Sequence, residues 1–140
     1  MLLLLNTSSP HATVSLAGEG GILFTEESPL PKEHAAWLHP AIERMMAQAG
    51  IKMNELEAVA VVAGPGSYTG LRVGMAAAKG ICFALGIPLI TQNTLVLMAA
   101  AMRGAAVENK ALICPMLDAR RQEVFTALYS PDMQEILAPG

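Results

Sequence analysis

The residues of this sequence that could contact a phosphate group lie in one glycine-rich stretch. It follows the apolar run at residues 59–63 and leads into a long helical segment. A glycine-rich turn before a helix offers free backbone N–H groups and the positive end of the helix dipole. The residues that could make a nucleotide contact here are Gly64, Gly66, Ser67, Tyr68, Thr69, Gly70 and Arg72.

The same stretch also fits a tight strand-to-helix turn without a ligand. No Gly-Lys-Ser/Thr follows it, as a P-loop requires. Thr69 stands where a dinucleotide fingerprint has its third glycine, and residues 84–98 hold no Asp or Glu for a ribose hydroxyl. The sequence therefore favours the turn, with Ser67 or Thr69 as the cap of the following helix, and leaves the phosphate contact as the alternative.

Other groups of catalytic or metal-ligating residues are not evident in the sequence. The histidines are His11, His34 and His39, and the last two are five residues apart, which does not place them on one helical face. The spacing from Gly64 to Ser67 is wrong for a Gly-x-Ser-x-Gly elbow, and Ser67 has no evident base. We therefore expect no catalytic residue and no metal site.

Composition limits the class of protein. The chain has 140 residues, a net charge of −3, 53% hydrophobic residues and only 15% charged residues. The acidic balance argues against nucleic-acid binding by a basic surface of its own, and the apolar content suggests a face covered by a partner. Cys82 and Cys114 lie in apolar runs and are expected to be buried thiols of a cytosolic protein. Residues 1–5 are too short for a signal or membrane segment.

The order of elements predicts an α/β fold with a mixed sheet. Strands are expected at residues 2–6, 12–17, 22–26, 59–63 and 88–91, the first three as an antiparallel meander. Helices are expected from residue 32 or 33 to 49 with Pro40 inside, at 71–85, and from a cap at Asn93 or Thr94 to residue 102. A hairpin of residues 111–117 and 123–129 around a turn at 118–121 would then begin a second, incomplete lobe over 111–140, after a first lobe over 1–110.

The helical segment at residues 71–85 is apolar or small almost all round. Only Arg72 and Lys79 are charged, and their spacing of seven places them on one face. A helix of this kind is buried either in a large core or against another chain. The residues alone leave that choice open.

Five motifs resemble those of the bacterial TsaB (YeaZ) family. They are Asn6-Thr-Ser8 with the strand that follows it, Glu33-His34 before Leu38-His-Pro40, the nine-residue stretch Gly64–Arg72, Gly74 with Ala78-Lys-Gly80, and Asp118-Ala-Arg120 with Glu123-Val124. The resemblance extends over almost the whole chain. Two departures stand out: the family's opening Asp is Asn6 here, and family members are longer.

The resemblance implies an actin-like, sugar-kinase-like fold whose first lobe holds a five-stranded RNase H-like sheet. It implies a catalytically silent cytoplasmic subunit that pairs with a TsaD-type catalytic subunit and a TsaE-type ATPase to transfer a threonylcarbamoyl group to the tRNA adenosine beside the anticodon. ATP and Mg²⁺ would be used by the complex, with no cofactor bound tightly by this chain, and tRNA would be reached only through the complex. The alternative is an independent phosphotransferase of the actin-like superfamily or a glycoprotease-like peptidase.

The resemblance also implies that the two first helices form the surface for the TsaD-type subunit. Because these helices present more apolar surface than one lobe of this size needs to cover, we expect the chain to pair with itself when that subunit is absent. The residues expected at this interface are Trp37, Leu38, Ile42, Met45, Arg72, Gly74, Met75, Ala77, Ala78 and Lys79.

Overall fold

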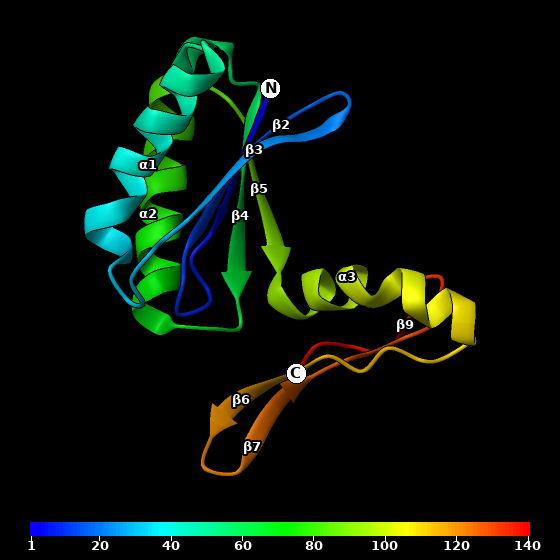
Figure 1. The fold of residues 1–140 in the computed structure, drawn as a ribbon. Coiled ribbons are helices and arrows are strands. Elements are labelled where there is room, and N and C mark those ends of the chain that lie inside the picture. The colour runs from blue at the N-terminus through cyan, green and yellow to red at the C-terminus, as the bar shows by residue number, and fades with distance from the viewer. The chain divides into compact units, whose positions relative to one another are not determined.

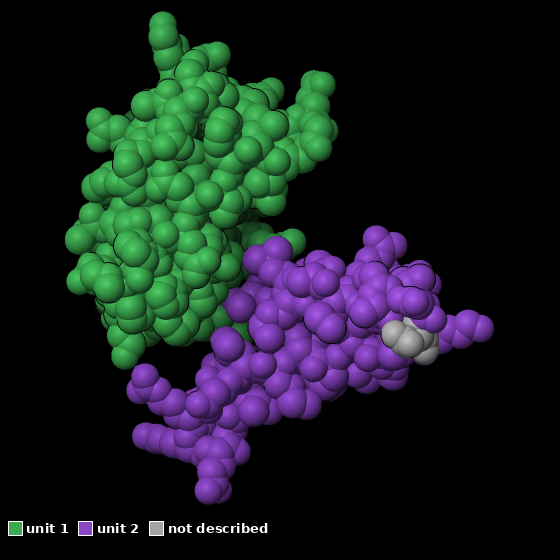
Figure 2. Space-filling view, viewed as in Figure 1, with its two compact units in different colours: residues 1–92 green, residues 93–140 purple. Residues whose placement is uncertain are grey.

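The computed structural model describes residues 1–140, apart from the side chain of Asn109. The chain forms two compact units, Met1–Gln92 and Asn93–Gly140, which Figure 2 shows in different colours. Each unit has its own cluster of buried apolar side chains.

The first unit is built on a five-stranded sheet. Its strands are β1 (Leu2–Asn6), β2 (Thr13–Gly18), β3 (Gly21–Glu27), β4 (Ala58–Gly64) and β5 (Leu89–Asn93), in the order β3-β2-β1-β4-β5. β1 is antiparallel to β2 and parallel to β4, so a meander is followed by a crossover through a helix. In β1 the side chains alternate in burial, and Leu3 and Leu5 face the core. The predicted meander and mixed sheet are confirmed.

Two helices lie on one side of this sheet, as Figure 1 shows: α1 (His34–Ala49) and α2 (Tyr68–Leu85). Leu38, Ile42 and Met45 of α1 pack with Leu3, Leu5 and other sheet residues in the main core cluster. Burying an aliphatic side chain of this size contributes about 1.5–3 kcal/mol, which is why the apolar stripe of α1 faces the sheet. A short 3₁₀ turn, η1 (Met53–Glu55), precedes β4.

The ends of both helices follow from their sequences. Gly50 and Gly86 adopt left-handed backbone conformations that stop α1 and α2. Ser67 caps α2, with its Oγ accepting a hydrogen bond from the N–H of Gly70 at 3.3 Å. The helix α1 is continuous across Pro40.

The second unit holds α3 (Thr94–Asn109) and four short strands: β6 (Met116–Arg120), β7 (Glu123–Thr126), β8 (Leu128–Tyr129) and β9 (Glu135–Leu137). β6 pairs with β7 and β8 with β9, both antiparallel. The N–H of Leu95 donates to Asn93 Oδ1 at 2.7 Å, so Asn93 is the cap of α3. The core of this unit is Leu95, Ala99, Ala106, Ile113, Ala127 and Tyr129.

Three boundaries differ from those predicted. α3 extends to Asn109 instead of residue 102, because Ala106 is buried and holds the last turns in the core despite Gly104. The first hairpin strand begins at Met116 instead of residue 111, since Pro115 has no N–H for a strand ladder. The division between units falls after Gln92 instead of residue 110, because α3 packs on Ile113 and Tyr129.

The turn of the β6–β7 hairpin also lies later than predicted. Asp118 belongs to β6, and the turn is made by residues 121–122. Asp118 Oδ1 accepts a hydrogen bond from the N–H of Arg120 at 2.8 Å, so the local side-chain bonding expected of this aspartate is confirmed.

Candidate functional site

The glycine-rich turn after β4 packs directly on the turn after β1. The N–H of Ser67 donates to the carbonyl oxygen of Ser8 at 2.8 Å. A Cβ on Gly66 would lie 2.6 Å from that oxygen, and Cβ atoms on Gly70 and Gly74 would overlap the carbonyl oxygen and the Oγ1 of Thr7. These glycines therefore serve the close approach of two backbone segments.

Several N–H groups that a phosphate would need are already bonded within the chain. Ser67 N–H donates to Ser8, Gly70 N–H to Ser67 Oγ, and Leu71 N–H to the Ser67 carbonyl oxygen at 2.8 Å. Arg72 places its guanidinium 4.2 Å from the centre of the Tyr68 ring. This geometry favours the tight-turn interpretation, and a nucleotide contact by residues 64–72 stays a prediction.

Asn6 closes the turn after β1 with its side chain. Its Oδ1 accepts hydrogen bonds from the N–H of Ser8 at 3.1 Å and from Ser8 Oγ at 2.7 Å. Both bonds use the amide oxygen as a neutral acceptor, which is the bonding of an Asx turn. Asn6 therefore orders the local backbone.

Two histidines hold the neighbouring loops. His11 Nδ1 lies 2.7 Å from the carbonyl oxygen of Ser28, and the buried His34 has its Nε2 2.8 Å from the carbonyl oxygen of Ser9. Each ring thus bonds a backbone carbonyl. Within the described residues, no group of three or more His, Cys, Asp and Glu side chains gathers as metal ligands would.

The two cysteines have different environments. Cys82 is buried in the first unit, with its Sγ 3.4 Å from the carbonyl oxygen of Pro88. Cys114 is exposed, so the expectation that both thiols are buried is wrong for Cys114. It lies just before Pro115, outside the strand that was predicted to bury it.

Most of the predicted interface residues belong to the core of the first unit instead. Leu38, Ile42, Met45, Gly74 and Ala78 are at most 4% exposed or closely packed on Thr7 within the chain. Contact of these residues with a partner stays a prediction. They lie on the faces of α1 and α2 that the sheet covers. Trp37 and Met75 are partly buried against the same core, whereas Arg72 and Lys79 are exposed.

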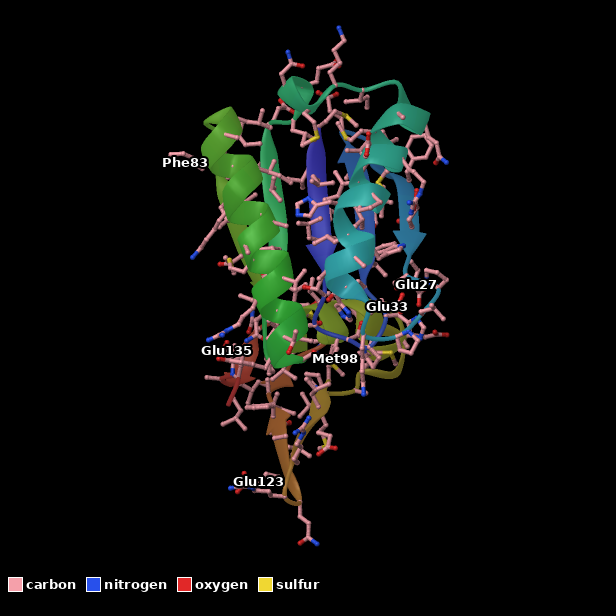
Figure 3. All side chains as sticks on the ribbon, turned by 90° about the vertical axis from the view of Figure 1, so that its left-hand side faces the viewer. Glu27, Glu33, Phe83, Met98, Glu123 and Glu135 are labelled. Carbon is pink, nitrogen blue, oxygen red and sulfur yellow. The ribbon has the colours of Figure 1, made fainter. Side chains whose placement is uncertain are left out.

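The outer face of these helices carries an apolar groove that the sequence did not single out. It has a volume of about 540 Å³, and Ala77 lies at its floor. Phe83 of the same helix does not line the groove; it is 92% exposed and in Figure 3 projects from the side of α2 opposite α1. The lining residues are Ala35, His39, Met53, Val73, Ala76, Ala77, Gly80, Ile81, Ala84 and Leu85.

A signal for this groove was present in the sequence. The spacing of Ala76, Gly80 and Phe83 places them on one side of the helix. This side differs from the buried side, which holds Gly70, Gly74, Ala78 and Cys82. α2 therefore has two apolar faces, of which the sheet covers one. Among the described helices, none has both the length and the apolar content needed to cross a membrane.

Comparison with known proteins agrees with this architecture. The family model of TsaD, tRNA N6-adenosine threonylcarbamoyltransferase, matches residues 13–137. The chain is 32% identical over 128 residues to the tRNA threonylcarbamoyladenosine biosynthesis protein TsaB of Bacillus subtilis, covering 91% of this chain and 54% of that protein. It is 31% identical over 132 residues to the Escherichia coli protein of the same name, covering 94% of this chain and 55% of that protein.

A solved structure shows the same fold. The solved structure of YeaZ from Pseudomonas aeruginosa superposes with a TM-score of 0.85 at 29% identity, covering 99% of this chain and 65% of that one. The chain spans about half the length of the curated relatives it matches. The sheet and the family model together define a protein with an actin-like, RNase H-like fold that matches the TsaD family model. Within that class, the chain belongs to the TsaB (YeaZ) family.

Proposed function

We propose that this chain is a non-catalytic partner subunit in the synthesis of threonylcarbamoyladenosine in tRNA. It binds a TsaD-type catalytic subunit through the outer face of α1 and α2, and a TsaE-type ATPase joins the pair. ATP and Mg²⁺ are used by the complex, and tRNA is reached only through it, in the cytoplasm. Without the catalytic subunit, the same face pairs with a second copy of the chain.

The observation that carries this proposal is the apolar outer surface of α1 and α2. It combines a groove lined mostly by alanine, glycine and aliphatic side chains with the 92% exposed ring of Phe83 elsewhere on α2, which is unusual for a surface that faces only water. Small residues such as Ala76 and Gly80 let a partner helix come close, and an aromatic anchor is typical of interface hot spots.

The absence of a catalytic role is supported by how the polar groups near the turn are used. Asn6 and Ser8 bond to each other within their own turn, and His11 and His34 each bond a backbone carbonyl oxygen of a neighbouring segment. Ser9 Oγ likewise donates to the carbonyl oxygen of His11. This pattern leaves no described serine hydrogen-bonded to a histidine ring, which a serine nucleophile would need as its base.

The binding experiment uses the purified chain and the TsaD-type subunit of the same organism. Ala76→Arg places a long charged side chain on the exposed wall of the groove without entering the core. We expect it to weaken the complex by at least about 30-fold, which corresponds to the loss of one interface hot spot of about 2 kcal/mol. Ala100→Arg, at an exposed position of α3, is the matched control and should bind normally.

Turnover assays separate this proposal from the enzyme alternatives. A solved Pseudomonas aeruginosa relative is described as similar to a peptidase, and the other alternative is an independent phosphotransferase. We expect the purified chain to hydrolyse neither ATP nor peptide. Turnover that is lost in Ser67→Ala or Asn6→Ala, or equal binding by Ala76→Arg and Ala100→Arg, would contradict the proposal.

A further inference from the structure

The outward face of α2 carries a stripe of five residues whose chemical types follow the same order from either end. Tyr68, Arg72, Ala76, Lys79 and Phe83 follow one another at intervals of four, four, three and four, so they share one helical face. All five are exposed. Read from either end, the stripe presents an aromatic ring, a cation, alanine, a cation and an aromatic ring.

The two cations of this stripe are not neutralised by the helix that carries them. α2 contains no Asp or Glu. The ion pairs found among the described residues join the N-terminus to Glu57 and Arg44 to Glu26, and neither involves Arg72 or Lys79. The Tyr68 ring beneath the Arg72 guanidinium holds that cation on the outer face.

The symmetry of the stripe places like charges opposite each other when two copies meet through it. When two α2 helices meet antiparallel about a twofold axis near Ala76, Arg72 of each copy lies opposite Lys79 of the other. Two like-charge contacts then form across the seam, and like charges juxtaposed across an interface are unfavourable. A partner helix with carboxylates about two turns apart would meet both cations with opposite charge instead.

We propose that Arg72 and Lys79 are specificity determinants of the α1–α2 face, which favour a partner helix carrying acidic residues over a second copy of this chain. This inference rests on the proposed function, because it assigns the charge pattern of the TsaD-type surface that occupies the face. The aromatic ends and Ala76 supply apolar contact with either partner. The cations decide between the two.

The test measures two equilibria with the full chain: binding to the TsaD-type subunit by calorimetry, and self-association by sedimentation equilibrium. Arg72→Gln, Lys79→Gln and the double variant remove the charges from exposed positions. Since exposed charge pairs contribute about 0.2–1 kcal/mol each, we expect the double variant to weaken the mixed complex by about 2- to 30-fold. Its self-association should become tighter by a comparable factor. Arg103→Gln, an exposed cation of α3, is the control and should change neither equilibrium.

Salt gives an independent readout on the unmodified chain. At an ionic strength of about 0.1 M the screening length of charge interactions is about 10 Å. Raising the ionic strength to about 0.5 M makes this length shorter. We expect this change to weaken the mixed complex and to strengthen self-association.

Two outcomes would overturn the inference alone. One is a mixed complex of normal affinity that responds neither to the double variant nor to salt. The other is self-association that salt and the double variant weaken, which would mean that a second copy supplies the carboxylate, with the exposed Glu43 of its α1 as the candidate. If the unmodified chain did not bind the TsaD-type subunit at either salt concentration, the proposed function itself would fail.

Discussion

At the residue scale, the glycines of the signature stretch are explained by packing. Gly66, Gly70 and Gly74 lie where the turn after β4 and the start of α2 approach Thr7 and Ser8, and a Cβ at any of them would meet atoms of the β1–β2 turn. A glycine-rich motif at a helix N-terminus is easily interpreted as a phosphate site from sequence. In this chain these glycines instead face the backbone and side chains of Thr7 and Ser8.

Gly70→Ala should therefore destabilise the first unit. The added Cβ would overlap the Thr7 carbonyl oxygen and lie 3.0 Å from Cδ2 of the buried His34 ring. Overpacking of this kind costs about 1–3 kcal/mol. Gly80→Ala on the same helix is the control: its Cβ would meet nothing within 4 Å, and alanine in a helix interior is favoured over glycine by about 0.5–1 kcal/mol. Urea unfolding followed by Trp37 fluorescence should shift in opposite directions, and equal shifts would refute the packing explanation.

Tyr129 is the residue of the second unit whose ionisation should affect stability. It is 3% exposed, and its hydroxyl has no hydrogen-bond partner among the described residues. Burial, and to a lesser extent the charge of Glu135, raises the pKa of Tyr129 above its ordinary value. The unfolded chain then loses this proton at lower pH than the folded unit does. The resulting stability is complete below about pH 10 and is lost as pH rises above it.

Tyr129→Phe should remove this loss of stability above about pH 10. At neutral pH the variant should be as stable as the unmodified chain or more stable by up to about 1–3 kcal/mol, because it no longer buries an unpaired hydroxyl. Thermal unfolding at neutral and high pH, followed by far-UV circular dichroism, measures both effects. Tyr68→Phe is the control, since Tyr68 is 68% exposed. A marked loss of stability at neutral pH would mean that the hydroxyl is satisfied.

At the element scale, local sequence signals predicted most of the first unit correctly. The meander, the stop of α1 at Gly50, the cap of α2 at Ser67 and the stop at Gly86 each depend on residues within one turn of the position they define. The faces of α1 and α2 were harder to predict. Leu38 and Met45 were expected at a partner surface, and they pack against residues of the sheet.

The reason is that α2 is apolar around most of its circumference, so its pattern does not say which face the sheet covers. That choice depends on where Thr7 approaches the helix, a contact between segments more than sixty residues apart in sequence. The length of α3 could not be predicted for a similar reason. Ala106 is held by residues from β8 and from the segment before β6, which local propensity does not include.

At the scale of the whole molecule, the two units differ in the core that supports them. The first unit has a sheet of five strands and two helices around one cluster, whereas the second combines one helix with two pairs of short strands. A unit as small as Asn93–Gly140 rarely gains more than about 3–5 kcal/mol from a single core. We therefore expect the second unit to unfold at lower urea concentration than the first.

Trp37 makes this expectation measurable, because it is the single tryptophan of the chain and belongs to α1. Its fluorescence follows the first unit, while far-UV circular dichroism follows the helices of both. The circular dichroism transition should begin at lower urea, and the two curves should not coincide. Hydrogen exchange adds a local measure: amides of β7, such as Val124, should be less protected than Val59 and Val61 of β4. Coincident curves with equal protection would show instead that both units unfold together, with the hairpin stabilised by contacts beyond its own small core.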